Sequence, residues 1–200
     1  NGCSNSNTGS VTVNAVPTVT INSATICNGQ NTTLTATPSL AGGSYSWSTG
    51  QTTQSISVSP SSTTSYSVSY TLNGCSSSGT GGVTVNPIPT VSVNSSTICN
   101  GQNTTLTATP NLTGGSYSWS NGQTTQSISV SPSSTTSYSV SYTLNGCSTS
   151  GTGSVTVNAV PTVTINSATI CNGQNTTLTA TPSLAGGSYS WSSGQTTASI

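Results

Sequence analysis

The sequence repeats with a period of 72 residues, so the fold of this chain must be built within one such unit and then copied. Trp47, Trp119 and Trp191 keep this interval, and 62 of 72 aligned positions are identical in the two complete units. We expect four segments: the C-terminal end of a preceding repeat at 1–16, complete Ig-like repeats at 17–88 and 89–160, and the N-terminal part of a following repeat at 161–200.

Apolar and hydroxyl-bearing residues alternate along most of the unit, and this period of two is typical of β-strands. Turn sequences such as Asn28-Gly29 and Asn73-Gly74 separate the alternating runs. Six or seven short strands in one unit predict an all-β fold class, a tandem of small antiparallel Ig-like β-sandwich domains. The strands predicted in the first unit are 17–23, 31–38, 43–49, 54–59, 65–73 and 81–86, with a short extra strand near 51–53.

The same alternation predicts which side chains form the core. Trp47 and Tyr45 could instead be exposed aromatics that stack on sugars, but they are in phase with the apolar positions, which favours burial. Tyr66 is expected to act as a tyrosine-corner-like anchor. The core markers are Trp47, Trp119, Trp191, Tyr66 and Tyr138, and the inward-facing set of the first unit is Val19, Ile21, Leu34, Ala36, Tyr45, Trp47, Ile56, Val58, Tyr66, Val68, Tyr70, Val83 and Val85.

The chain has no Lys, Arg, Asp, Glu or His, and this composition excludes most function classes. General acid–base catalysis and nucleophile activation depend on those side chains, so we expect no enzyme and no catalytic residue. Without His or carboxylate ligands we expect no metal and no cofactor, and without cations no nucleic-acid partner. No apolar run is long enough to span a bilayer, so no direct membrane insertion is expected.

Two cysteines per unit predict cystines and therefore an oxidising, extracellular location. Pairing within the unit closes a 48-residue span worth about 4 kcal/mol, pairing of Cys75 with Cys99 closes 24 residues, and pairing of Cys27 with Cys147 joins neighbouring units. The cysteines lie at the first and last turns of a unit. Seven strands would place these two turns at opposite ends of the sandwich and favour the third pairing, whereas six strands would place them at the same end. The favoured pairs are Cys27–Cys75 and Cys99–Cys147, with Cys3 and Cys171 pairing outside these 200 residues.

Several asparagines head N-x-Ser/Thr triplets, which are acceptor sequences for N-glycosylation. Three of them occupy the same place in successive units. In a chain so rich in Asn and Thr such matches also arise by chance. The candidates are Asn31, Asn94, Asn103, Asn111 and Asn175.

The order Cys-Asn-Gly at 27–29, Tyr-Ser-Trp-Ser at 45–48 and Asn-Gly-Cys at 73–75 resembles the SprB-type, Ig-like or PKD-like tandem repeats of bacterial surface adhesins. The resemblance covers most of each unit. It implies secreted, cell-surface tandem β-sandwiches that build long adhesive or structural filaments, and it implies pairing of the two cysteines within one domain. Such repeats commonly carry an acidic residue before the Asn-Gly-Cys turn, where this chain has Thr71-Leu72. Calcium-dependent rigidity is therefore not expected.

These observations predict a non-catalytic structural subunit of an extracellular bacterial filament or adhesin stalk. An uncharged surface lacks the repulsion that keeps proteins dispersed, so copies of the chain itself are the expected partners, in a filament or lateral bundle. The alternative function is a surface adhesion module that binds polysaccharide or other cell surfaces through its Ser/Thr face, or that binds ice.

Overall fold

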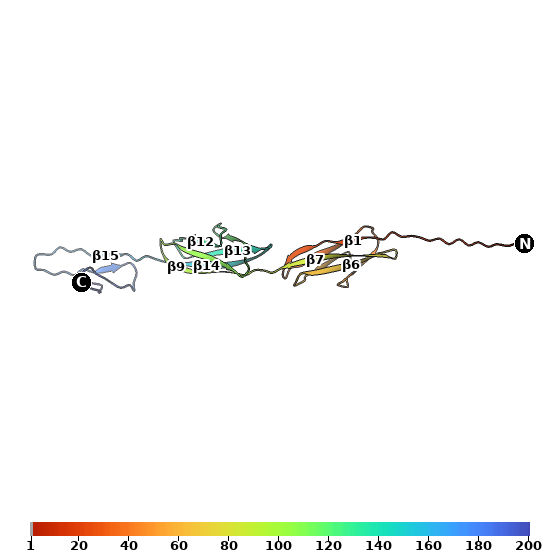
Figure 1. Ribbon diagram of the computed structural model, residues 1–200. Coiled ribbons are helices and arrows are strands. Elements are labelled where there is room, and N and C mark those ends of the chain that lie inside the picture. Colours follow the sequence, from red (N-terminus) through yellow and green to blue (C-terminus); the bar gives the residue numbers. More distant parts are fainter. Residues whose placement is uncertain (1) are drawn as a thin grey trace. The chain divides into compact units, whose positions relative to one another are not determined.

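The computed structural model describes residues 2–200, and its regular secondary structure there consists only of strands (Figure 1). The fold is all-β, in Ig-like sandwiches that follow one another along the sequence. Among these residues no helix is long and apolar enough to cross a membrane.

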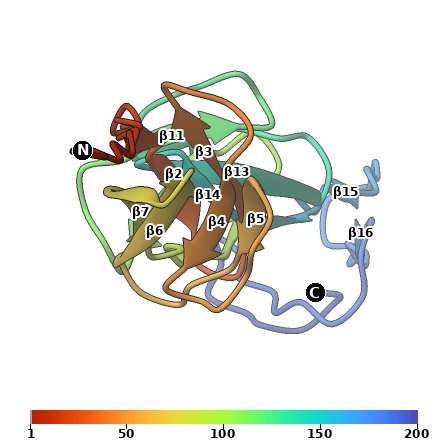
Figure 2. The same ribbon diagram turned by 90° about the vertical axis from the view of Figure 1, so that its right-hand side faces the viewer.

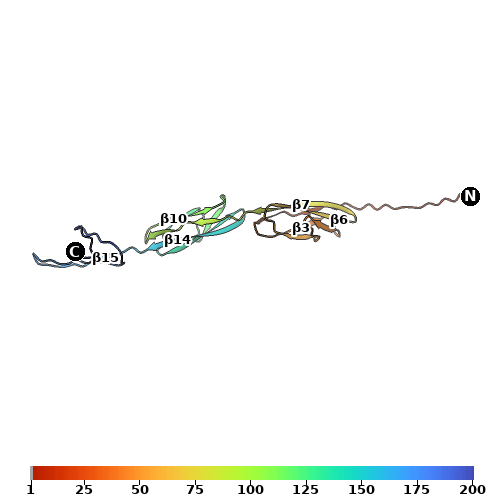
Figure 3. The ribbon, with the colours of Figure 1, turned by 90° about the horizontal axis from the view of Figure 1, so that it is seen from below.

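The first repeat contains seven strands in two sheets, and Figure 3 shows β3 in a different layer from β6 and β7. One sheet has the order β1-β3-β5 and the other has the order β2-β7-β6-β4. The strands are β1 (Val19–Ile21), β2 (Ala24–Cys27), β3 (Thr32–Pro38), β4 (Ser44–Trp47), β5 (Ser55–Val58), β6 (Thr64–Leu72) and β7 (Cys75–Asn86).

The second repeat has the same strand orders, β12-β10-β8 and β11-β13-β14-β9. Residues from 161 onward form a two-stranded sheet, β15-β16, and an isolated bridge between Thr179 and Ser199. The bounds are β8 (Val91–Val93), β9 (Ser96–Cys99), β10 (Thr104–Pro110), β11 (Ser116–Trp119), β12 (Ser127–Val130), β13 (Thr136–Leu144), β14 (Cys147–Asn158), β15 (Val163–Ile165) and β16 (Ala180–Pro182).

The N-terminal part of the repeat is split between the two sheets. β1 pairs antiparallel with β3, whereas β2 pairs parallel with β7, and the labels of β2, β7, β6 and β4 can be followed in Figure 2. Asn22 lies between β1 and β2 in the sequence. Its side chain accepts a hydrogen bond from the Thr35 amide at 2.7 Å and donates one to the Thr33 carbonyl at 3.2 Å. Backbone pairing of β1 with β3 ends at Ile21, and the side-chain amide of Asn22 supplies the next hydrogen bonds to β3.

Of the strand predicted at 17–23, the structure keeps Val19–Ile21 as β1, and β2 lies beyond the predicted bounds. The seventh strand is β2, and residues 51–53 do not form a strand. In β2 only Ile26 is buried, so its four residues carry too short an alternation to be read from sequence.

β6 and β7 form a long hairpin closed by a two-residue turn. Asn73 has φ 49° and Gly74 has φ 82°, the positive values that a tight hairpin turn requires, and Leu72 pairs with Cys75. β7 begins six residues earlier than predicted because its first half contains Ser, Thr and Gly instead of apolar residues. Gly79 is needed there, since a Cβ would lie 2.5 Å from the Val19 carbonyl oxygen.

The core of the first repeat lies between the two sheets. All thirteen residues predicted to face inward are buried in it or packed against it, and Ile26 and Leu72 complete the cluster. Trp47 and Trp119 are each 3% exposed, and the Trp47 indole donates a hydrogen bond to the Thr53 carbonyl at 2.8 Å. Tyr138 and Trp191 are only half-buried.

The tyrosine anchor is Tyr70, not Tyr66. The Tyr70 hydroxyl donates to the Leu40 carbonyl and accepts from the Gly43 amide, both at 2.7 Å. Tyr66 is 9% exposed and contributes to the core, but Tyr70 is nearer the turn that has to be fastened. A Cβ on Gly43 would lie 2.4 Å from the Thr71 carbonyl oxygen, so glycine allows this close approach.

Candidate functional site at the joint between repeats

The candidate site is the joint at which the chain leaves one repeat for the next. Parallel pairing of β2 with β7 places Cys27 opposite Asn86, the last residue of β7. The Asn28 amide donates a hydrogen bond to the Asn86 carbonyl at 2.9 Å. Cys27 is therefore held at the end of the repeat where the chain continues toward Pro89.

The second cysteine is presented by the hairpin turn of the following repeat. Asn145 and Gly146 have φ 50° and 81°, and Cys147 is the first residue after this turn, at the start of β14. The segment Ser141–Ser150 belongs to the same compact unit as the residues up to Val91. The turn of one repeat is thus part of the packing at the end of the other.

Cys27 and Cys147 form a disulfide across this joint, with a Cα–Cα separation of 5.7 Å. That separation lies in the usual range for a cystine. The Asn86 side chain donates to the Asn145 carbonyl at 2.9 Å, and the Cys27 sulfur lies 3.8 Å from the Gly146 carbonyl oxygen. Cys147 is 1% exposed. The cystine is buried at its Cys147 end and braced by an asparagine contact beside it.

This disulfide corrects the predicted pairs Cys27–Cys75 and Cys99–Cys147. β7 runs for 12 residues from Cys75 to Asn86, which is beside Cys27. At about 3.3 Å per residue the two ends of β7 lie roughly 35 Å apart, far beyond the 7 Å that a cystine can span. Seven strands place the two turns at opposite ends, which was the condition that favoured pairing between repeats.

Two contacts of the bonded joint recur one period earlier, around Cys75: that of the Asn86 side chain with the Asn145 carbonyl, and that of the Cys147 sulfur with the Asn86 carbonyl oxygen at 4.0 Å. The Asn14 side chain donates to the Asn73 carbonyl at 2.9 Å, and the Cys75 sulfur lies 3.8 Å from the Asn14 carbonyl oxygen. Asn14 and Asn86 are equivalent positions, as are Cys75 and Cys147. Cys75 is half-buried and its sulfur is unpaired, and Cys3, Cys99 and Cys171 are unpaired and exposed.

Asn86 and Asn145 were not predicted as site residues. Asparagine is abundant in the chain, so neither residue stands out in the sequence. Their positions in the repeat could have identified them: Asn86 directly precedes the proline-containing boundary, and Asn145 directly precedes Gly-Cys.

A second surface feature is the outer face of the sheet β2-β7-β6-β4, which we call the hydroxyl face. Exposed Ser69 pairs with Ser78, exposed Ser67 pairs with Thr80, and the Thr71 and Ser76 hydroxyls hydrogen-bond at 2.8 Å. The face is contiguous and uncharged. Its members on β4, β6 and β7 are Ser44, Ser46, Ser65, Ser67, Ser69, Thr71, Ser76, Ser78, Thr80 and Thr84.

The ionisable groups with a perturbed pKa are two half-buried tyrosines, Tyr45 and Tyr117. Burial and the neighbouring Tyr70 raise the pKa of Tyr45 above its ordinary value of 10.0, and the two rings are 4.9 Å apart. Burial and Tyr142 raise the pKa of Tyr117 in the same way. Both shifts favour the neutral phenol.

The structure separates the candidate glycosylation residues by what their side chains do. Asn31, Asn103 and Asn175 are exposed. Asn94 is the equivalent of Asn22, and its amide nitrogen donates to the Thr105 carbonyl at 3.2 Å. The Asn111 side-chain oxygen accepts from the Thr90 amide at 2.7 Å. All five asparagines are exposed, but a sugar on Asn94 or Asn111 would disrupt the hydrogen bond that its side chain makes, to the Thr105 carbonyl or from the Thr90 amide.

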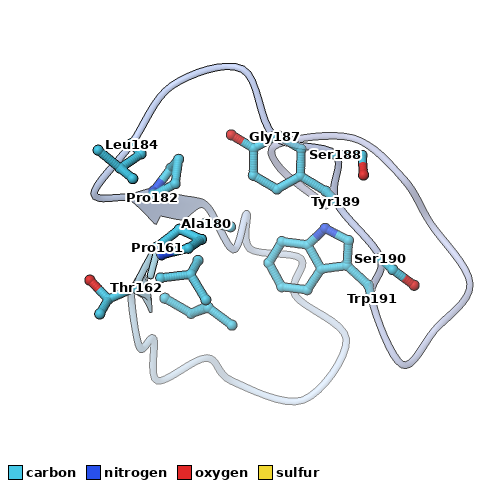
Figure 4. Close-up of a pocket in the computed structure, with 12 residues that line it drawn as sticks. Pro161, Thr162, Ala180, Pro182, Leu184, Gly187, Ser188, Tyr189, Ser190 and Trp191 are labelled. Atoms are coloured by element: carbon cyan, nitrogen blue, oxygen red, sulfur yellow. The ribbon is translucent and has the colours of Figure 1, made fainter. Parts of the chain in front are cut away.

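A hollow of about 320 Å³ lies among residues 161–191, with Trp191 and Tyr189 on one side and Pro161 and Pro182 on the other (Figure 4). Val163 lines this hollow and is 59% exposed, whereas the equivalent Val19 is buried in the core of the first repeat. The hollow is therefore the uncovered inner face of a sandwich, not a cavity shaped for a ligand.

No family model matches the chain, and no curated protein is detectably similar to it. Among solved structures, the I-band fragment I67-I69 from titin matches 86% of this chain and 77% of its own, with 10% identity and a TM-score of 0.48. DIP-gamma IG1+IG2 matches 72% of this chain and 98% of its own, with 15% identity and a TM-score of 0.38. These values carry no argument about function, and the fold assignment rests on the strand order.

Proposed function

We propose that the chain is a non-catalytic structural segment of a bacterial cell-surface filament or adhesin stalk, in which tandem Ig-like repeats are fastened to one another by cystines. The observation that carries the proposal is the Cys27–Cys147 disulfide, which joins one repeat to the next across the joint. A protein whose task is to stay connected under load gains directly from such a bond.

Three further properties support an exported, structural role. Cystines persist in oxidising compartments outside the cytoplasm. The absence of charged residues removes most pH- and salt-dependent interactions from a surface exposed to a changing medium. The resemblance to SprB-type repeats favours a bacterial surface location.

Electron microscopy of the protein on its cells and after purification tests this role. We expect filaments that keep their length between pH 3 and pH 8 and between low and molar salt, and that weaken when a reductant is added. Filaments that dissociate as salt rises or pH falls would contradict the proposal, as would a cytoplasmic location.

A second candidate function, polysaccharide binding, is favoured by the hydroxyl face. Ten Ser and Thr residues form one uncharged surface on β4, β6 and β7. Glycan arrays and cell-wall pull-downs with the 200-residue chain test it. Replacing Ser67 and Ser69 by Ala should reduce binding, whereas the matched change of exposed Thr33 and Ser57 on the opposite sheet should not. Equal binding by both variants would exclude the hydroxyl face.

A further inference from the structure

The cystine at the joint connects positions that recur every 72 residues, and this has consequences for a chain of many repeats. Cys27 and Cys147 are 120 residues apart. Shifted by the period, the same bond would join Cys99 to a cysteine one repeat beyond Cys147, and Cys75 to a cysteine one repeat before Cys27. The contacts of Asn14 with Asn73 and Cys75 repeat those of Asn86 with Asn145 and Cys147, so the turn that carries Cys75 is held as the turn that carries the bonded Cys147 is held.

We propose that Cys75 and Cys99 are cystine sites toward the preceding and following repeats, and that these bonds link alternate chain segments into two continuous covalent threads that make the oxidised array inextensible. The inference rests on the proposed function in that it needs further repeats of this period in an oxidising compartment. It adds a mechanical property to that function.

Each thread is built from the segment between Cys75 and Cys99 and its equivalents. Starting at Cys75, the backbone passes through β7, the joint and β8 to Cys99 at the end of β9. A disulfide would then join Cys99 to the cysteine 120 residues further along the chain, where the next such segment begins, so the residues between are not part of the thread. The other thread contains Cys27, the observed disulfide to Cys147, and the segment from Cys147 to Cys171. Every joint is then crossed by one thread as peptide and by the other as disulfide.

The segments have little slack. Of the 25 residues from Cys75 to Cys99, 12 lie in β7, 3 in β8 and 4 in β9. The joint at 87–90 contains Pro87 and Pro89, which hold neighbouring residues in extended conformations. Twenty-four residue steps reach at most about 80–86 Å, whatever happens to the remainder of the repeats. Unfolding of a sandwich therefore cannot lengthen an oxidised array beyond this limit for each pair of repeats.

Formation of each cystine takes two protons and two electrons from a pair of thiols. A protein disulfide oxidant of the extracytoplasmic compartment can accept them. One cysteine thiolate attacks the oxidant's disulfide and forms a mixed disulfide, and the thiolate from the neighbouring repeat then displaces the oxidant. The new S–S bond joins the two repeats, and the oxidant leaves as a dithiol.

The test is the stretched length of single full-length molecules in concentrated guanidinium, measured before and after reduction. Denaturant removes the mechanical resistance of the sandwiches, so the length reports only the covalent path. The molecules are first alkylated, so that free thiols cannot exchange.

Each pattern of cystines predicts a different lengthening on reduction, because each leaves a different fraction of the residues in the shortest covalent path along the oxidised molecule. The two-thread pattern leaves 24 residue steps in every 144, so reduction should lengthen the molecule between five- and sixfold by bond count. Pairing within repeats would give just under threefold, and pairing of the Cys75–Cys99 type about 1.5-fold. Either smaller ratio, or no change at all, would overturn the proposal.

Substitutions in the full-length chain provide an independent control. Cys75→Ser alone interrupts one thread and should leave the oxidised length unchanged, because the other thread still limits it. Cys75→Ser with Cys147→Ser interrupts both and should release the 48 residues between Cys27 and Cys75, up to about 170 Å. Release by Cys75→Ser alone would contradict the two-thread arrangement. These measurements need no filament, so they can succeed or fail independently of the microscopy that tests the proposed function.

Discussion

At the scale of single residues, polar groups of side chains pair with backbone groups that the sheets of the sandwich leave without a partner. Tyr70 is the clearest case, because its buried hydroxyl satisfies both the Leu40 carbonyl and the Gly43 amide. Tyr142 makes the same two bonds in the second repeat, to Leu112 and Gly115. A single hydroxyl thus fastens a loop that has no apolar side chain deep in the core.

Tyr70→Phe should lower the unfolding free energy by about 1–3 kcal/mol, because two backbone groups lose their partner while the ring still fills its place. Urea unfolding followed by tryptophan fluorescence measures the change. The matched control is Tyr66→Phe, since the hydroxyl of Tyr66 makes none of these contacts, and it should have little effect. Equal destabilisation by both variants would refute the anchoring role of Tyr70.

The raised pKa values of Tyr45 and Tyr117 predict an alkaline limit to stability. The unfolded state releases the phenol protons near pH 10 while the folded state still holds them, so stability is complete below pH 10 and falls above it. Thermal melts between pH 3 and pH 8 should show a nearly constant midpoint, because the chain has no Asp, Glu or His side chain to titrate there. The double variant Tyr45→Phe, Tyr117→Phe should have a shallower loss above pH 10.

At the scale of elements, the change of sheet between β1 and β2 decides where the joint cysteine lies. β1 belongs to the sheet of β3, and β2 crosses to the sheet of β7, which brings Cys27 beside Asn86. Asn22 makes the crossing possible, because its side chain bonds the two β3 groups that the backbone abandons. Asn94 and Asn166 make equivalent contacts in the other repeats.

Asn22→Ala should destabilise the first repeat by about 1–3 kcal/mol, since the Thr35 amide and the Thr33 carbonyl lose their partner. Hydrogen exchange should show faster exchange of the Thr35 amide and of β2. Asn31→Ala, which changes an exposed asparagine in the turn before β3, is the control and should leave both unchanged. Unaltered exchange in Asn22→Ala would show that the crossing does not depend on this side chain.

At the scale of the whole molecule, the cystine contributes stability to a chain that has no charge networks and only a small core in each repeat. It closes a loop with a sequence separation of 120, for which the chain-entropy model gives about 4–5 kcal/mol. Cys27→Ser, Cys147→Ser and the double variant should therefore lower the unfolding midpoint by similar amounts. Cys75→Ser should leave the 200-residue chain unaffected, because Cys75 is unpaired there.

A non-reducing digest of the 200-residue chain checks this pairing directly. A protease that cuts after aromatic residues and leucine leaves the cysteines on peptides 1–34, 73–106 and 145–178. We expect 1–34 linked to 145–178, with 73–106 released alone. Linkage of all three peptides would instead indicate Cys27–Cys75 and Cys99–Cys147.

Alternation and repetition in the sequence determined the fold class, most of the strands and the core from Val19 to Val85, because burial of every second residue leaves a direct mark on composition. The tertiary structure alone decided the pairing of the cysteines. That pairing depends on β2, whose four residues are too few to show an apolar alternation. It also depends on the first half of β7, where Ser, Thr and Gly replace the apolar residues that would indicate a strand. Chain entropy favours closing the shorter loop, but the rigid length of β7 separates Cys27 from Cys75. Cys27 therefore bonds to the neighbouring repeat.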